Sequence, residues 1–218
     1  VHLGSRAVLM GKTVVHYTLE LAETTIGLRY DSAITGVPLS MTFEYKDQIK
    51  EKITNIEGGL IVKEYPTATV GSGHFRHLLN ELSMKKNFSA DIIYIDYINL
   101  CQSTRLKFGA NVNSYSYIKA VAEELRGLAV EKNVPIVGAT HLNLTGFTNS
   151  DPGREDTSES FALPATVDFM CALISTEEME QLGQIMVKQL KNCYNDPTLH
   201  KRFVVGVDRA KMRLFNVE

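Results

Sequence analysis

Three short apolar segments of the chain each run into a residue that can handle protons, phosphate or a metal ion. They are Val14 to Leu19 followed by Glu20, Ile92 to Ile95 followed by Asp96, and Val134 to Thr140 followed by His141. A carboxylate in such a place can hold the Mg²⁺ of a bound nucleotide, and a neutral imidazole offers one hydrogen-bond donor and one acceptor. Two acids and a histidine in this order predict one site to which three segments contribute.

These side chains can meet only if the apolar segments are strands of one sheet. Apolar residues on both faces of a short segment predict a buried strand of a parallel sheet, and ligands of such sheets bind at the carboxyl ends of the strands. Helical patterns separate the strands, most clearly over Tyr117 to Lys132, where apolar residues recur every three or four positions. The alternation predicts an α/β fold with a mostly parallel sheet flanked by helices.

Further elements follow from the same periodicities and from turn residues. We expect helices ending near Met10 and over Glu20 to Ile34, Phe43 to Ile56, Ser72 (as the cap) to Asn87 and Glu177 to Leu182, and strands at Leu60 to Val62 and Phe169 to Ile174. Three strand-like segments predict an antiparallel C-terminal extension: Gln184 to Leu190, Arg202 to Val207 and Met212 to Val217. Polar loops are predicted over Leu100 to Asn111 and Asn143 to Ser160, and loops as long as the second are usually functional or disordered.

Composition is that of an ordinary globular protein. The 218 residues, 44% hydrophobic and 22% charged, predict a single domain over residues 1–218. A formal net charge of −2 gives no general sign of nucleic-acid binding, so any such site must be local. No apolar run reaches membrane-spanning length, and the three cysteines follow no metal-ligand pattern. We therefore expect a cytoplasmic protein with reduced thiols and no membrane partner.

The tripeptide Gly11-Lys12-Thr13 looks like part of a phosphate-binding loop, but its context excludes this. The full motif needs a glycine where this chain has Arg6. A phosphate loop also follows a strand and opens a helix, so that the helix N-terminus faces the phosphate. Here the tripeptide follows a helical pattern and precedes a strand, so we expect a helix stop at Gly11.

With these segments in view, the chain resembles the C-terminal RecA-like motor domain of DnaB-like hexameric replicative helicases, in particular those of T-even-type phages. The segments that carry the resemblance are Tyr17 to Glu23, Leu78 to Leu82, Ile92 to Tyr97, Val121 to Arg126 and Leu163 to Met170. The resemblance implies a RecA-like P-loop NTPase core with antiparallel C-terminal strands. It also implies a motor that hydrolyses ATP with Mg²⁺ between the subunits of a hexameric ring.

The resemblance assigns roles to individual residues of the expected nucleotide site. Glu20 matches the glutamate that polarises the attacking water, and Asp96 matches the acid that holds Mg²⁺ through water. His141 matches a sensor of the γ-phosphate, and Arg29 matches an arginine near the nucleotide base. Each also has a structural reading: a helix-start acid for Glu20, a solvated strand end for Asp96, a structural histidine for His141 and a surface arginine for Arg29.

The resemblance also implies contacts with single-stranded DNA. The segment 143–160 matches the second DNA loop of the family, and an ordinary surface loop is the alternative. The first DNA loop of the family falls near two basic residues of this chain. Two basic residues alone are weak evidence for contact with single-stranded DNA. The residues concerned are Arg105 and Lys107 in the first loop and Asp156, Glu159 and Ser160 in the second. Primase and a helicase loader are further partners that the family implies, in the cytoplasm of a bacterial host.

Two departures from the family pattern bear on activity. The phosphate loop is absent from the sequence, and the match would place it shortly before Val1. We therefore expect that the chain is a piece of a longer protein. We expect this piece to bind ATP poorly, because the phosphate loop is missing. We also expect it to self-associate, because it lacks a strand of its sheet. The family's Lys-x-Arg appears here as Lys191-Asn192-Cys193, so Lys191 is retained but the arginine finger is replaced. Arg202 or Arg209 are candidates to replace it.

Three alternatives to an active motor remain at this point. A RecA-like domain that binds DNA or acts as a scaffold without turning over ATP fits the loss of the finger arginine. A RecA-type recombinase or clock-type ATPase shares the same core. A flavodoxin-like or Rossmann binding domain ranks last, because the first turn here is not rich in glycine.

Overall fold

The computed structural model describes residues 1–107, 112–141, 153, 162–196 and 198–217. Its first part contains α1 (His2–Leu9), β1 (Val14–Thr18), α2 (Glu23–Thr35), η1 (Leu39–Met41), α3 (Lys46–Thr54), β2 (Leu60–Glu64), α4 (Ser72–Lys86), β3 (Ile92–Asp96), η2 (Ile98–Leu100), α5 (Ser114–Lys132) and β4 (Ile136–Gly138). Its second part contains α7 (Ala162–Thr166), β5 (Phe169–Ile174), α8 (Glu177–Gln181), β6 (Gln184–Asn192), β7 (Arg202–Asp208) and β8 (Arg213–Asn216).

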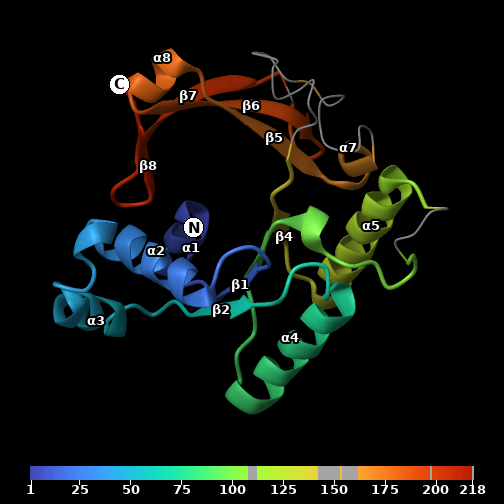
Figure 1. Ribbon diagram of the computed structural model, residues 1–218, viewed down its shortest axis with the longest axis horizontal. Helices are drawn as coiled ribbons and strands as arrows, with labels where there is room; N and C mark the ends of the chain where they lie inside the picture. Colours follow the sequence, from blue (N-terminus) through green and yellow to red (C-terminus); the bar gives the residue numbers. More distant parts are fainter. Residues whose placement is uncertain (108–111, 142–152, 154–161, 197, 218) are drawn as a thin grey trace.

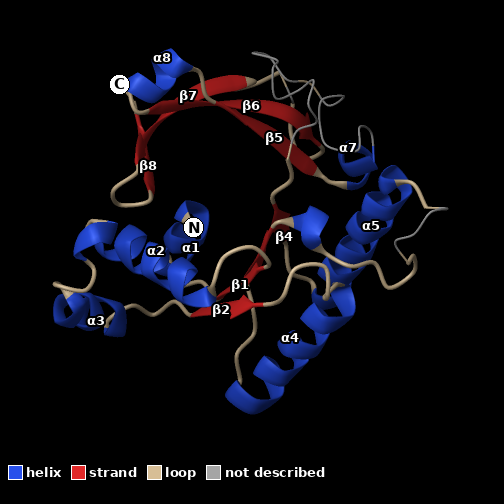
Figure 2. Ribbon diagram, viewed as in Figure 1, coloured by secondary structure: helices blue, strands red, loops and turns tan. Residues whose placement is uncertain are grey.

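The first part is built on a parallel sheet with the strand order β2-β1-β3-β4 (Figure 2). Every residue of β1 is buried, as expected for a central parallel strand whose two faces are both covered. On one face Val15 and Tyr17 join the core formed with α4 and α5, and on the other Val14 packs against α1 and α2. The parallel α/β core expected from the sequence is confirmed.

The second part is an antiparallel sheet with the order β5-β6-β7-β8, which arches over the parallel sheet (Figure 1). The start of β8 joins the two parts. Arg213 donates from Nε to the carbonyl of Ala33 at 2.7 Å and from Nη2 to that of Ile34 at 3.0 Å, so it caps the last turn of α2. The N–H of Leu214 donates to Nδ1 of His2 at 3.1 Å. The antiparallel C-terminal extension is confirmed.

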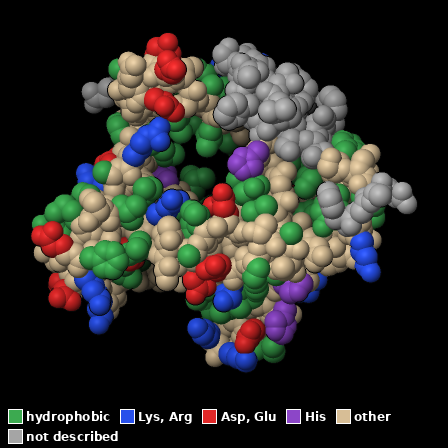
Figure 3. All heavy atoms as spheres, in the orientation of Figure 1, with side chains coloured by type: hydrophobic (Ala, Val, Ile, Leu, Met, Phe, Trp, Pro, Cys, Tyr) green, Lys and Arg blue, Asp and Glu red, His purple; other side chains and the backbone are tan. Residues whose placement is uncertain are grey.

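The space around these contacts is not filled evenly. In the space-filling view a hollow separates the antiparallel sheet from the parallel half, and hydrophobic side chains gather along its rim (Figure 3). Val137 on β4 and Phe169 and Leu173 on β5 are exposed apolar residues. The strands β4 and β5 are edges of their respective sheets in the described part of the chain.

The Gly11-Lys12-Thr13 segment lies between α1 and β1, as expected. Gly11 has a φ of 76°, which suits a glycine just beyond a helix. The Thr13 hydroxyl donates to the Asp91 carboxylate at 2.8 Å, and the Thr13 N–H donates to the same oxygen at 2.8 Å. Thr13 therefore ties the start of β1 to the start of β3 and has a structural role.

The observed bounds differ from the expected ones at several elements, and α2 begins at Glu23 and not at Glu20 as expected. The α4 helix is capped by Gly71, and Ser72 is its first residue, because the Ser72 hydroxyl donates to Glu124 on α5. The β4 strand has three residues, since only Ile136 to Gly138 pair with β3. The charged segment after Gly36 forms the short helices η1 and α3. None of the helices in the described part of the chain is long and apolar enough to cross a membrane.

Candidate functional site

The register of the parallel sheet brings the predicted site residues to one edge. Thr18 at the end of β1 pairs with Asp96 at the end of β3, and the N–H of Leu19 donates to the Asp96 carbonyl at 2.9 Å. Ile95 pairs with Gly138 at the end of β4. The three strands therefore end side by side, with Asp96 on the last residue of its strand and Glu20 and His141 just beyond the ends of theirs.

The backbone around Glu20 is held on both sides. The Thr18 hydroxyl donates to the Leu21 carbonyl at 2.7 Å, and the Thr67 hydroxyl donates to that of Leu19 at 2.7 Å. The Glu20 side chain itself is exposed and has no hydrogen bond or ion pair to any described residue. It is thus presented by a fixed turn at the strand end.

Other acids take the helix-start role that was the alternative for Glu20. The α2 helix begins at Glu23, and the Glu23 N–H donates to the Glu64 carboxylate at 3.0 Å. The Glu64 N–H donates back to the Glu23 carboxylate at 3.2 Å. This reciprocal pair satisfies the first turn of the helix and leaves Glu20 without a capping role.

Asp96 and Arg29 share their surroundings with the amino group of Val1. Burial lowers the pKa of that amino group, while the Asp96 carboxylate raises it and the Arg29 guanidinium lowers it. The Nε atom of Arg29, on α2, is buried and has no hydrogen-bond partner among the described residues, so one donor of this side chain is unsatisfied.

His141 packs against the residue that follows Asp96. Its imidazole meets the Tyr97 ring edge-on, with centroids 4.4 Å apart and an interplanar angle of 84°. The Thr140 hydroxyl donates to the Asn99 amide oxygen at 2.8 Å, and the Ile98 N–H donates to the Ala139 carbonyl at 3.1 Å. These contacts lock the segment after β4 to the segment after β3.

The residues expected at a subunit boundary lie on the antiparallel sheet. The Lys191 amine donates to the carbonyls of Pro164 at 2.7 Å and Ala165 at 3.4 Å, so it caps the end of α7. Cys193 has an exposed thiol, and its N–H donates to the Asp168 carbonyl at 2.9 Å. Neither Lys191 nor Cys193 contacts the three strand ends within the described residues.

The two arginines considered as replacements for the finger lie at opposite ends of β7. Arg202 is its first residue, whereas Arg209 follows its last and approaches Glu180 at 3.9 Å. The structure of the chain alone does not bring either one to the strand ends.

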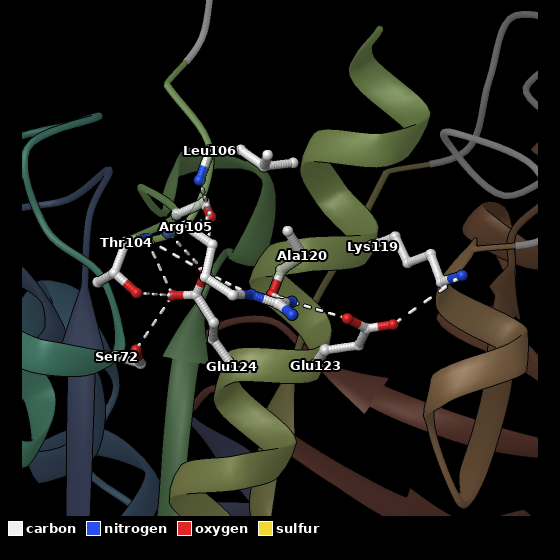
Figure 4. Close-up of polar contacts among 9 residues, drawn as sticks. Ser72, Thr104, Arg105, Leu106, Lys119, Ala120, Glu123 and Glu124 are labelled. Atoms are coloured by element: carbon white, nitrogen blue, oxygen red, sulfur yellow. Dashed lines mark hydrogen bonds and ion pairs between the residues drawn. The ribbon is translucent and has the colours of Figure 1, made fainter. Parts of the chain in front are cut away.

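The two basic residues of the first predicted DNA loop have different surroundings. The Arg105 guanidinium is engaged by α5, where Nη2 donates to Glu123 at 2.7 Å and to the Ala120 carbonyl at 3.1 Å (Figure 4). Lys107 is exposed and has no ion pair to any residue that the structure describes. The residues expected in the second DNA loop, Asp156, Glu159 and Ser160, lie outside the described residues.

Glu124 is a residue of this region that the pattern of the sequence did not single out. It accepts hydrogen bonds from Ser72, Ser103, Thr104 and Arg105 (Figure 4). A signal existed in the sequence, because Glu124 lies beside Leu125 and Leu128 on the inward face of α5, where a charged side chain needs partners.

An open hollow of about 310 Å³ lies between α4 and α5, lined by Ser72, Arg76, Thr104, Arg105, Glu123, Glu124 and Gly127. No group of three or more His, Cys, Asp or Glu side chains in the described part of the chain is arranged to hold a metal ion. A Mg²⁺ ion at Asp96 would therefore need water and phosphate oxygens as its other ligands, which is the usual arrangement for Mg²⁺ with nucleotides.

Comparison with known proteins finds a replicative helicase with a similar sequence. No known protein-family model matches the chain. The chain is 38% identical over 219 residues to the DnaB-like replicative helicase of Enterobacteria phage T4, in an alignment that covers 96% of this chain and 46% of that protein. The chain resembles part of a DnaB-like replicative helicase. It spans less than half of the length of this relative.

Solved structures agree on the fold. The chain matches the structure of a DnaB-like replicative helicase studied with its interactions with primase, with a TM-score of 0.80 and 15% identity over 100% of this chain and 55% of that one. It also matches a solved ATPase domain with a TM-score of 0.79 and 15% identity, over 99% of this chain and 78% of that one. The RecA-like α/β fold expected from the sequence is confirmed.

Proposed function

We propose that this chain is part of the motor domain of a DnaB-like replicative helicase, which hydrolyses ATP between the subunits of a hexameric ring and moves along single-stranded DNA. One observation carries the proposal: the sheet register places Asp96 and the strand ends before Glu20 and His141 along one edge. The 38% identity to a DnaB-like replicative helicase supports the same function.

The residues at the strand ends take separate roles in phosphoryl transfer to water. Bound ATP with its Mg²⁺ would supply the γ-phosphoryl group and neutralise part of its charge. Glu20, exposed on a fixed turn, would orient and polarise the attacking water, and Asp96 would hold the metal that accompanies the nucleotide. His141 senses the γ-phosphate, and its packing on Tyr97 links that sensor to the strand that carries Asp96.

The surroundings of Asp96 fit a nucleotide. Arg29 has a buried donor without a partner, and a nucleotide base or phosphate would satisfy it. We propose that the phosphate cradle comes from residues that precede Val1 in the parent protein.

Contacts with other molecules follow from the same family. We propose that Lys107, the first-loop segment from Arg105 onward and the second-loop residues Asp156, Glu159 and Ser160 line the path of single-stranded DNA. Primase is a proposed partner, and the structure of a DnaB-like replicative helicase studied with its interactions with primase supports this proposal. A helicase loader is proposed from the family resemblance alone. Lys191 is proposed to reach the site of a neighbouring subunit once α7 releases its amine.

The proposal is tested by ATP hydrolysis in the full-length parent protein, with and without single-stranded DNA. We expect DNA-stimulated hydrolysis that Glu20→Gln lowers by roughly a hundredfold or more, the range for loss of a general base. Glu51→Gln, which changes an exposed acid on α3, is the matched control and keeps full activity. Equal activities of the two variants would contradict the role of Glu20.

A second candidate function is that of a RecA-like domain that binds DNA or acts as a scaffold without hydrolysing ATP. One specific feature of the chain favours it. Cys193 stands where the family has its arginine finger, and loss of such a finger costs about a thousandfold or more. Replacing Cys193 by Arg in the full-length protein distinguishes the two. A large gain in hydrolysis supports an impaired motor, and absence of hydrolysis in both proteins supports the scaffold.

A further inference from the structure

The Glu124 carboxylate is the centre of a hydrogen-bond cluster that fastens the segment after β3 to α5. It accepts from the Ser103 hydroxyl at 2.6 Å, the Thr104 N–H at 3.0 Å, the Thr104 hydroxyl at 2.8 Å and the Arg105 N–H at 3.3 Å (Figure 4). The Ser72 hydroxyl on α4 donates to the same carboxylate at 3.2 Å. Only 8% of the Glu124 side chain is exposed.

A carboxylate suits this place because it accepts several hydrogen bonds and donates none. Burial raises the pKa of Glu124, but the hydrogen bonds from Ser103, Thr104 and Arg105 outweigh it and bring the pKa to about 2. The group is therefore ionised under ordinary conditions. The Ser103 hydroxyl extends the cluster, since it accepts from the N–H groups of Arg105 and Leu106 at 3.1 Å each.

Arg105 closes the cluster over the surface of α5. Its Nη2 lies 2.7 Å from Glu123, and its Nε lies 3.5 Å from Glu124. The guanidinium is thus occupied by two carboxylates of one helix. Lys107 follows just after this fastening, with its side chain exposed.

The same segment is held on its other side by the loop between β2 and α4. The Gln102 N–H donates to the Val70 carbonyl at 2.6 Å, and the Ala68 N–H donates to the Leu100 carbonyl at 3.0 Å. A side chain at Gly71 would collide with the Gln102 carbonyl. The stretch from Asp96 to Arg105 is therefore supported on both sides, between the proposed metal position and the start of the first loop.

We propose that Glu124 is the positioning residue of the first DNA loop, that Arg105 is part of the fastening that Glu124 organises, and that Lys107 is the basic residue of this loop that meets phosphate. The DNA part of this inference rests on the proposed function. The fastening itself depends only on the contacts within the chain.

Hydrogen exchange tests the fastening. In Glu124→Gln one carboxylate oxygen is replaced by an amide nitrogen, which cannot accept hydrogen bonds from Ser103, Thr104 or Arg105. We therefore expect the N–H groups of Thr104, Arg105 and Leu106 to exchange with solvent roughly ten- to a hundredfold faster. Glu131→Gln is the matched control on the same helix and leaves these N–H groups unchanged, because Glu131 pairs with Arg76 and Lys132 and with no described residue of the segment after β3.

Thr104→Val provides a milder second variant, since it removes one hydroxyl donor to Glu124 and conserves side-chain shape. It should speed exchange in the same segment by a smaller factor. Unchanged exchange of this segment in both folded variants would overturn the proposal.

The salt dependence of binding to a labelled oligothymidylate tests the assignment of the two basic residues. Lys107→Ala should lower the slope of log affinity against log salt by about 0.7, the value for one phosphate contact on a single strand. Arg105→Ala should weaken binding but leave the slope unchanged, because Arg105 fastens the loop. An equal loss of slope in Arg105→Ala would overturn that assignment.

The two proposals fail in different ways. If the protein does not bind the oligothymidylate, but Glu124→Gln speeds amide exchange, the DNA role is contradicted and the fastening by Glu124 is supported. If the protein binds the oligothymidylate, but amide exchange is unchanged in Glu124→Gln and Thr104→Val, the proposed function is supported and the role of Glu124 is contradicted.

Discussion

The ring of Tyr97 fixes the orientation of the His141 imidazole by an edge-on contact. Tyr97→Leu removes that aromatic pair, which is worth about 1 kcal/mol, whereas Tyr97→Phe keeps it. We expect the imidazole proton resonances of His141 to shift in Tyr97→Leu, because the neighbouring ring current is lost, and to stay nearly in place in Tyr97→Phe. In the full-length protein only Tyr97→Leu should reduce stimulation by DNA. Identical His141 resonances in both variants would contradict the contact.

The ionisation of Glu124 predicts how stability depends on pH. Its pKa is about 2 in the folded chain and 4.5 as the ordinary value, so the folded state favours the ionised form. The resulting stabilisation, on the order of 3 kcal/mol, is fully present above about pH 4.5 and is lost as the pH falls towards 2. The difference in unfolding free energy between the native chain and Glu124→Gln should therefore shrink between about pH 6 and about pH 3. Urea unfolding of both proteins at about pH 6 and about pH 3 measures this difference in free energy, and a difference that does not change with pH would contradict the prediction.

Single residues also show what the sequence could predict of the site. Glu20, Asp96 and His141 were predicted because an apolar segment that ends on a polar residue is a local pattern, and the sheet register brings the three strand ends to one edge. The engagement of Arg105 by Glu123 and Glu124 was not predicted, because these partners meet only when the segment after β3 packs on α5. Arg105 was therefore expected to be as available as Lys107.

At the scale of elements, strands and helices with a strong period were predicted with nearly correct bounds. The α5 helix differs by its first turn only, because Asn113 caps it through the Ser116 N–H. The β4 strand was expected to be longer, because apolar residues continue to Ala139, but pairing with β3 stops at Gly138. Local pattern describes the hydrophobic segment, and the neighbouring strand decides how much of it pairs.

Two glycines inside helices give a prediction at the same scale. A Cβ added to Gly27 on α2 or Gly127 on α5 meets no atom within 4 Å. Alanine there should raise the free energy of unfolding by about 0.5 to 1 kcal/mol, because glycine loses more backbone entropy on folding.

Gly4 on α1 provides the opposite control for the glycine prediction. A Cβ at Gly4 would collide with the Tyr30 ring, so Gly4→Ala should destabilise the chain. Thermal or urea unfolding of the three variants measures the effects. A stabilising Gly4→Ala, or a destabilising Gly27→Ala, would contradict the packing of α1 on α2.

At the scale of the whole molecule, the contacts of Arg213 hold the antiparallel sheet to the parallel one. Arg213 donates to two carbonyls at the end of α2, and the Leu39 N–H donates to the carbonyl of Ala210, just before β8, at 2.8 Å. Arg213→Met keeps much of the apolar side chain but removes the donors, and should cost about 2 kcal/mol of unfolding free energy. Lys201→Met, an exposed change before β7, is the control. Equal stability of both variants would contradict a clamp at Arg213.

The edges of the two sheets predict how the chain associates. The strands β4 and β5 are edge strands in the described part, and Val137, Phe169 and Leu173 are 38%, 51% and 63% exposed. Open edges with apolar side chains pair with other chains. We therefore expect the mass measured by light scattering to rise with concentration.

A charge on β5 tests whether that strand is responsible. Leu173→Lys should lower the measured mass towards that of the monomer, because lysine on an edge strand opposes further pairing. Leu182→Lys, which changes a side chain 70% exposed beyond the end of α8, should leave association unchanged and controls for the added charge. If the unaltered chain stays a monomer over a wide range of concentration, its edges are protected from pairing and the prediction is wrong. If both variants reduce association equally, net charge and not the β5 edge governs it.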